Sequence, residues 1–163
     1  MSFALALAVS APSPIVATAS AHHWKTYTNE RFGTRAEYPA EIFKDPVFSD
    51  NGDGGRWSSD IGAKLLIFGS PNSLNQTPAS YAEFLKHSDR LRYSRITYRL
   101  IKPKSLILSG TARGHIFYER YEFGDPSGAI HAIAIEYPAT AQSILGPLIA
   151  RMSSSLKWIV RAN

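Results

Sequence analysis

Four predicted β-strands follow one another through residues 94–137, with only short turns between them. In residues 94–102, Ile96, Tyr98 and Leu100 alternate with polar residues, which is the period of a strand with one buried face. The other strands are predicted at 105–110, 115–123 and 129–137, and the turn before the last one reads GDPSG. Connections this short require antiparallel pairing, so this half of the chain predicts an antiparallel sheet.

Two predicted helices flank these strands. Thr77 is a good N-cap and Pro78 suits the first helical position, and apolar residues at helical spacing continue from there to about Arg90. After Pro138, residues 141–154 again place apolar residues on one helical face. Helices that pack against an antiparallel sheet form an α+β layer. The predicted fold class is therefore α+β, an antiparallel sheet flanked by two main helices.

Shorter elements are predicted outside this region. Strands are expected at 24–28, 34–38, 56–59 and 64–69, with one helical turn at Ile42 and Phe43 and a last edge strand at 156–159. A chain of 163 residues is long enough for one domain with a real core. Because no linker or repeat divides residues 22–163, we expect them to form a single α+β domain.

Residues 1–21 have a different character. Phe3 to Val9 form a short apolar run, and Ala19-Ser20-Ala21 matches the small-residue pattern of a signal-peptidase site. We therefore expect a secretory signal peptide at 1–21, cut after Ala21, and a periplasmic or secreted protein. No Lys or Arg precedes the apolar run, so an alanine-rich tail of a cytoplasmic protein is the alternative. We expect no transmembrane segment in residues 22–163, where no stretch is long and apolar enough.

Three short motifs stand in the N-terminal half. Residues 24–33 read W-x-x-Y-x-N-x-R-F-G, residues 38–39 read Y-P, and residues 51–54 read N-G-D-G. Together they resemble a group of small exported bacterial proteins with no assigned function. The order of elements is, more remotely, similar to that of PsbP-like domains. That second resemblance implies an α/β/α sandwich, an architecture that mostly serves binding and assembly.

The glycine-rich stretch SDNGDGGRWSSD at 49–60 has the ligand spacing of an EF-hand calcium loop. Counted from Ser49, it places Asn51, Asp53 and Asp60 at ligand positions and Gly54 at the glycine position. However, Ser49 is neutral, Asp60 is shorter than the usual Glu, and the flanking residues do not read as helices. A tight turn between two strands accounts for the same residues, because Asn-Gly and Asp-Gly supply positive φ angles.

Histidine provides the second candidate metal ligand. If the chain is cut after Ala21, the amine and imidazole of His22 could chelate copper, although a solvated tail is the ordinary alternative. We expect His131, in the middle of a strand, to be a hydrogen-bonded packing residue. The absence of cysteine excludes disulfides and thiol nucleophiles. We predict no cofactor, and calcium and copper are the metals that the sequence leaves open.

No catalytic residue is predicted. The chain contains no G-x-S-x-G, S-x-x-K or HExxH motif. Glu119 and Glu136 lie on strands that we expect to pair, where two carboxylates could carry out acid–base chemistry. A cross-strand lattice with neighbouring Arg and Lys is the alternative. A small periplasmic hydrolase or metal-dependent enzyme, using these glutamates or the 51–60 loop, is therefore the second functional hypothesis.

Residues 86–104 hold seven Lys and Arg residues against one acid, Asp89. Strand alternation places Arg95 and Arg99 on the same outer face. We select four candidate ligand-binding residues: Arg92, Arg95, Arg99 and Lys102. Such a patch attracts polyanions, here an anionic envelope component or partner protein, whereas no nucleic-acid fold signature is present. A solvated face that maintains solubility is the alternative.

These observations predict an exported, non-enzymatic binding or accessory module of the cell envelope. An assembly subunit of a larger envelope complex is a third hypothesis, and the oligomeric state stays open.

Overall fold

The structure, a computed structural model, describes residues 22–89 and 91–159. The predicted signal peptide at 1–21 lies outside the described residues. Neither described helix has the length or the apolar character needed to cross a membrane.

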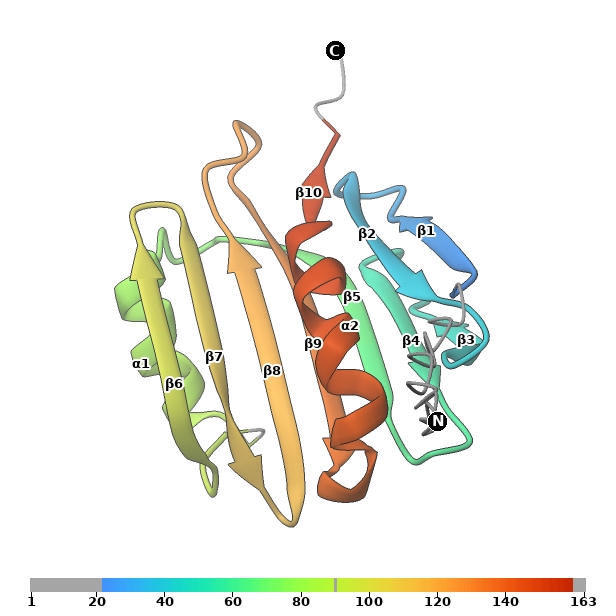
Figure 1. Cartoon of the computed structure of the whole chain (residues 1–163). Helices are drawn as coiled ribbons and strands as arrows, with labels where there is room; N and C mark the ends of the chain where they lie inside the picture. The colour runs from blue at the N-terminus through green and yellow to red at the C-terminus, as the bar shows by residue number, and fades with distance from the viewer. Residues whose placement is uncertain (1–21, 90, 160–163) are drawn as a thin grey trace, which may run out of the picture.

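A seven-stranded sheet forms the centre of the molecule, and all its neighbouring strands are antiparallel (Figure 1). In spatial order it consists of β3 (Lys44–Phe48), β4 (Gly54–Ser58), β5 (Lys64–Pro71), β9 (Ala129–Pro138), β8 (His115–Glu122), β7 (Ser105–Ala112) and β6 (Arg95–Lys102). The central strand β9 is buried on both faces from residue 129 to 135. The four strands predicted at 94–137 are confirmed.

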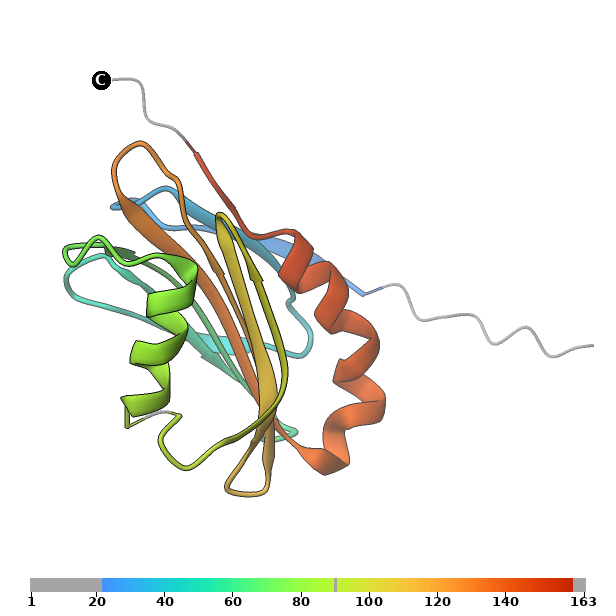
Figure 2. The ribbon, with the colours of Figure 1, turned by 90° about the vertical axis from the view of Figure 1, so that its left-hand side faces the viewer.

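The two helices lie on opposite faces of this sheet (Figure 2). Helix α1 (Pro78–His87) packs on β6 and β7, whereas α2 (Gln142–Ser154) follows a short 3-10 turn, η1 (Ala139–Ala141), and packs on β9. A three-stranded sheet of β1 (Trp24–Thr28), β2 (Thr34–Pro39) and β10 (Lys157–Trp158) lies on the α2 side, where β2 contacts α2, β5 and β9. The predicted α+β fold, an antiparallel sheet between two helices, is confirmed.

The start of α1 follows from its sequence. The Thr77 hydroxyl accepts a hydrogen bond from the Ser80 amide at 3.2 Å, and the Ser80 hydroxyl accepts one from the Thr77 amide at 2.9 Å. This reciprocal capping box satisfies two amides that the first helical turn leaves unpaired. The helix ends at His87, earlier than the predicted end near Arg90.

The sheet separates two hydrophobic cores. On the α2 side the core includes Trp57, Leu65, Ile133, Leu145 and Met152. On the α1 side it includes Tyr81, Leu85, Leu106, Phe117 and Tyr121. This division follows from strand alternation, because successive side chains of β8 and of β9 enter opposite cores.

Strand β3 was not predicted. All five of its residues are exposed, so they show no alternation that could reveal a strand. Asp45 has a φ of +49°, and the register shifts between Lys44 and Val47. Just before β3, the amides of Ile42 and Phe43 donate to the Pro39 carbonyl at 3.1 and 3.0 Å, so residues 39–43 form the expected single helical turn, which does not continue.

A bulge in β6 corrects the predicted faces of that strand. Arg95 lies opposite Thr111 and Arg99 lies opposite Leu108, with a register shift between Ile96 and Tyr98. The extra residue on β6 inverts the alternation, and residues directly opposite each other share a face. Thr111 and Leu108 are three positions apart on β7, so their side chains lie on opposite faces of the sheet. Arg95 therefore faces the α2 side, and Arg99 faces the α1 side. The prediction that the two arginines share a face is therefore wrong.

Candidate functional site

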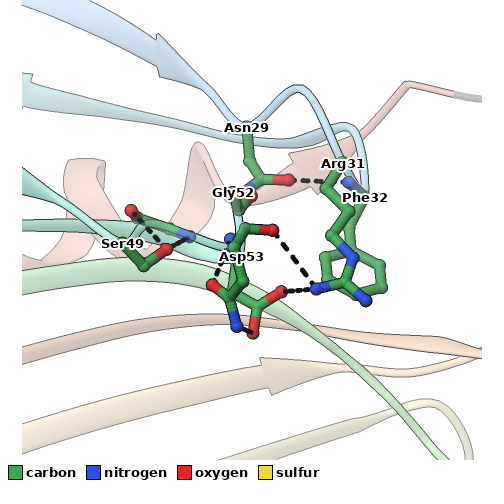
Figure 3. Close-up of polar contacts among 8 residues, drawn as sticks. Asn29, Arg31, Phe32, Ser49, Gly52 and Asp53 are labelled. Atoms are coloured by element: carbon green, nitrogen blue, oxygen red, sulfur yellow. Dashed lines mark hydrogen bonds and ion pairs between the residues drawn. The ribbon is translucent and has the colours of Figure 1, made fainter.

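The motif residues of the N-terminal half meet where the loop after β1 touches the loop between β3 and β4 (Figure 3). The Asn29 amide nitrogen donates to the Gly52 carbonyl at 2.6 Å, and the Asn29 amide oxygen accepts from the Phe32 backbone N–H at 2.6 Å. Asn29 is 1% exposed. Two short hydrogen bonds from a buried side chain therefore hold the two motifs together.

Arg31 and Asp53 form the exposed half of the same contact (Figure 3). The Arg31 guanidinium is 2.7 Å from the Asp53 carboxylate and 3.2 Å from the Asn51 carbonyl. The Asn51 amide nitrogen donates to the other Asp53 oxygen at 2.7 Å. Both Asp53 oxygens are thus engaged within the protein. The loop is a tight turn between β3 and β4, which confirms the turn interpretation of this stretch.

The structure does not bring all the expected calcium ligands together, because Asn51 and Asp53 are in contact but Asp60 is distant. Asp60 lies in the turn after β4, where its carboxylate is 2.8 Å from the Lys44 ammonium. Asp53 and Asp60 therefore lie at opposite ends of a five-residue strand, roughly 15–20 Å apart at about 3.3 Å per residue. Among the described residues, no group of three or more His, Cys, Asp and Glu side chains is placed to hold a metal ion.

His22 lies beside Glu41, in the turn after β2. Its Nδ1 contacts one Glu41 oxygen, and the His23 backbone N–H donates to the other at 3.1 Å. Burial alone would raise the pKa of Glu41, but its hydrogen bonds, including those from His22 and His23, outweigh burial and lower that pKa. The ring of His22 is therefore held by a carboxylate, and copper binding by this residue stays a prediction.

A buried polar chain joins three elements that are distant in sequence. The Thr34 hydroxyl is 2.7 Å from His131 Nδ1, and His131 Nε2 is 3.0 Å from the Asp125 carboxylate. Thr34 and His131 are fully buried, and the His131 ring stacks on Trp158 at 5.0 Å between centroids. The expected role of His131 as a hydrogen-bonded packing residue is confirmed. No substrate could reach the Thr34 hydroxyl. These hydrogen bonds therefore attach the three-stranded sheet to the seven-stranded sheet.

Burial lowers the pKa of His131, and the carboxylate of Asp125 only partly offsets this effect. For Asp125 the balance is different. Burial would raise the pKa of Asp125, but the amide and hydroxyl of Ser127 together with His131 hydrogen-bond the carboxylate and lower the pKa. The histidine is therefore held in its neutral form beside a charged carboxylate.

The α2 side of β6, β7 and β8 forms an uncovered surface, which we call the basic face. Its members include Arg95, Tyr98 and Lys102 on β6 and Arg120 on β8. Helix α2 reaches only as far as β8, where Ser153 is 2.8 Å from the Tyr118 hydroxyl. Arg120 pairs with Glu122 at 2.6 Å. Arg95 and Lys102 form no ion pair with any described residue.

The structure separates the four cations selected from the sequence. Arg95 and Lys102 belong to the basic face. Arg99 lies on the α1 side, 3.3 Å from Glu83, and Arg92 follows α1 and lies 3.4 Å from Asp89. Sequence reasoning missed Glu83 as a counterion because it precedes the basic stretch, and only packing of α1 brings it to β6.

Glu119 and Glu136 lie on the same face but in different surroundings. Glu119 is fully buried on the α1 side, and the Tyr121 hydroxyl donates to its carboxylate at 2.5 Å. Glu136 lies on β9, opposite Phe117 of β8, and Phe117 is two residues before Glu119. Glu136 and Lys64 line a polar cleft of about 230 Å³. Glu119 is thus neither accessible from solvent nor part of a surface charge lattice.

A second uncovered surface lies on the α1 side of β3, β4 and β5, and we call it the apolar groove. Its volume is about 380 Å³, and its lining includes Val47, Arg56, Leu66, Phe68 and Ser70. Val47 is 57% exposed. Sequence reasoning missed this groove because it depends on β3, which shows no strand pattern of its own.

The comparisons with known proteins show a shared fold. No protein-family model matches the chain, and no curated protein matches it. The chain is similar to the solution structure of cyanobacterial PsbP (CyanoP) from Synechocystis sp. PCC 6803, with a TM-score of 0.62 and 11% sequence identity. The match covers 87% of this chain and 96% of that one. The PsbP-like architecture implied by the order of elements is therefore confirmed at the level of fold.

Proposed function

We propose that the protein is an exported, non-enzymatic binding or accessory module of the cell envelope, which contacts an anionic surface or partner through the basic face. One observation carries this proposal. Arg95 and Lys102 project from an uncovered part of the sheet and form no ion pair with any described residue. A cation without a local counterion keeps its full attraction for an external anion.

The rest of the basic face supports the same role. Tyr98 lies between the two cations on β6 and is 51% exposed. Its ring combines an apolar body with a polar hydroxyl, which suits contact with a surface that is polar outside and apolar beneath. The formal net charge of +5 adds a long-range attraction toward anions.

Charges and a bulge on an edge strand have a second physical role, since they prevent pairing with strands of other molecules. Both edge strands carry features that hinder such pairing. Strand β6 has cations and a bulge, and β3 has Pro46 and an irregular register. Edge protection requires only that charges be present, whereas binding requires them on one particular face. The two roles can therefore be separated by experiment.

The export part of the proposal is supported by residues 1–21 as a sequence pattern, with the mature chain starting at His22. The hydrolase alternative has less support. Glu119 is fully buried, and Asp53 is engaged by Arg31 and Asn51. Within the part of the chain that the structure describes, Glu119, Glu136 and Asp53 do not meet in one cleft that is open to solvent.

Cosedimentation with phosphatidylglycerol vesicles tests the proposed contact. We expect binding at low salt that weakens by at least about tenfold at 0.5 M NaCl, because screening shortens the reach of exposed charges. The double variant Arg95→Glu/Lys102→Glu should weaken binding about tenfold or more at low salt.

The matched control is Arg92→Glu/Arg99→Glu, which changes the net charge equally but off the basic face. It should retain binding within about threefold, since both arginines already have carboxylate partners. Equal losses in the two double variants, or binding that salt does not weaken, would contradict the proposal.

A further inference from the structure

We infer that the apolar groove binds the acyl chain of a single-chain anionic amphiphile, with the anionic head group at Arg56. This site lies on the other side of the sheet from the basic face and takes one small molecule. It is therefore independent of the proposed surface contact.

The floor of the groove is a row of side chains across three strands. Val47, Arg56 and Leu66 lie directly opposite one another on β3, β4 and β5, so they share a face. Phe68 follows on the same face of β5, two residues after Leu66. Leu66 and Phe68 are only partly buried, although β5 lies inside the sheet, because α1 contacts β6 and β7 and leaves this part open.

A glycine lies beside Phe68 in the lining of the groove. Gly54 lies opposite Phe68, on the face that forms the floor. A Cβ atom at Gly54 would come within 2.4 Å of the Ile67 carbonyl oxygen, so no larger residue fits without displacing backbone. The volume of about 380 Å³ falls within the range of small-molecule sites, about 300–1,000 Å³.

The charges of the groove select an anionic head group. Arg56 forms no ion pair with any described residue. Asp53, the acid that also lines the groove, is already paired with Arg31 and hydrogen-bonded by Asn51. Lys64 and the exposed Asp45 line a neighbouring depression with Arg56, and Lys64 lies opposite Glu136, so the charge of Lys64 is offset and Arg56 carries the argument. Within the described part of the chain, the groove thus holds one unpaired positive charge, at Arg56, among the apolar side chains of Val47, Leu66 and Phe68, which complements an anion attached to a hydrocarbon chain.

The adjacent edge strand argues against a strand from a second copy. Pro46 removes one backbone donor from β3, and the strand is irregular between Lys44 and Val47. These features weaken pairing with another strand. A flexible acyl chain needs no backbone donors and requires only exposed apolar surface.

Isothermal titration of the full chain with dodecyl phosphate, kept below its micellar concentration, tests the inference. We expect saturable binding of one molecule, and weaker binding of the neutral dodecyl maltoside. Arg56→Glu should weaken dodecyl phosphate binding about tenfold. Val47→Asp should weaken it at least tenfold, because a carboxylate would lie on the floor beside the head group.

Ser70→Trp should have an effect as large as that of Val47→Asp, because the indole would fill the groove. If this variant does not fold, Val47→Asp still decides the question, since Val47 is exposed and its replacement leaves the core intact. Arg95→Glu/Lys102→Glu is the control and should bind dodecyl phosphate normally.

Three results would overturn the inference: no saturable binding by the unmodified protein, unchanged binding by Val47→Asp, or a ligand-free dimer that Val47→Asp converts to a monomer. The last result would mean that a second copy covers the groove. None of them affects the vesicle experiment, so the two proposals can fail separately.

Discussion

The sheet has two uncovered regions, and they differ in chemistry. The apolar groove lies over β3–β5 on the α1 side, and the basic face lies over β6–β8 on the α2 side. Each exists because the helix on that side does not extend across the whole sheet: α1 packs on β6 and β7, and α2 packs on β9. Figure 2 shows the two helices on opposite faces. The basic face carries mostly polar and charged side chains, which water can solvate. The groove exposes Val47, Leu66 and Phe68 to water, so it gains most from a bound apolar ligand.

The two regions also differ in how they are anchored. The strands of the groove are held from behind by Trp57, which contacts Tyr27, Tyr38 and Phe48. Asn29 and the Thr34–His131 contact add buried polar bonds at the same end of the molecule. The basic face is carried by the edge hairpin of β6 and β7 and exposes its side chains to solvent. We therefore expect the groove to depend on the core and the basic face to tolerate substitution.

The largest expected difference between the two regions involves their aromatic residues. Trp57 is 1% exposed, so Trp57→Ala should lower the free energy of unfolding by about 3–5 kcal/mol, through lost burial and an unfilled cavity. Tyr98→Ala, on the basic face, should cost less than about 0.5 kcal/mol. Urea unfolding followed by circular dichroism measures both. Similar losses would remove the proposed difference in anchoring.

The buried contact in Figure 3 should have an intermediate effect. Asn29→Ala removes two short hydrogen bonds, so the Gly52 carbonyl and the Phe32 N–H lose their side-chain partner. The expected loss is about 2 kcal/mol. Arg31→Ala removes only the exposed half of the contact and should cost at most about 1 kcal/mol. Urea unfolding measures both losses. A larger loss of unfolding free energy in Arg31→Ala than in Asn29→Ala would contradict this expectation.

The smallest effect concerns pH and tests the attachment of the small sheet. Because burial lowers the pKa of His131 in the folded protein, the unfolded chain binds the additional proton more readily. Stability should therefore be complete above the unfolded value of 6.5 and decline as the pH falls below it. One proton limits the slope to about 1.4 kcal/mol per pH unit. The lowered pKa of Asp125 adds a further loss only in more acidic solution, below 3.8.

Unfolding measured between pH 7.5 and 5 checks this expectation, with His131→Gln as the matched variant. The variant should be less stable at pH 7.5 and should show a flatter dependence on pH. A slope that is unchanged in His131→Gln would assign the proton to another group.

Several elements could be predicted from local sequence. Alternation identified β6 to β9, and Thr77 and Pro78 marked the start of α1. These signals work because strand and helix periods are properties of neighbouring residues. Strand β3 carries no such signal, since it is exposed on both faces and contains Pro46. The candidate site residues were harder to predict than the strands. Arg95 and Arg99, for example, were predicted to share a face of β6 but lie on opposite faces.

The sequence by itself determined the class of fold: period, turns and caps are local, and they specify antiparallel strands and two amphipathic helices. Only the tertiary structure decided which surfaces are open and which charges are paired. Thr34 meets His131 across 97 residues, and Glu83 reaches Arg99 from a different element. The bulge that turns Arg95 to the basic face is visible only in the register against β7. Such features depend on which strands pair and how far each helix extends over the sheet, and no local pattern records either.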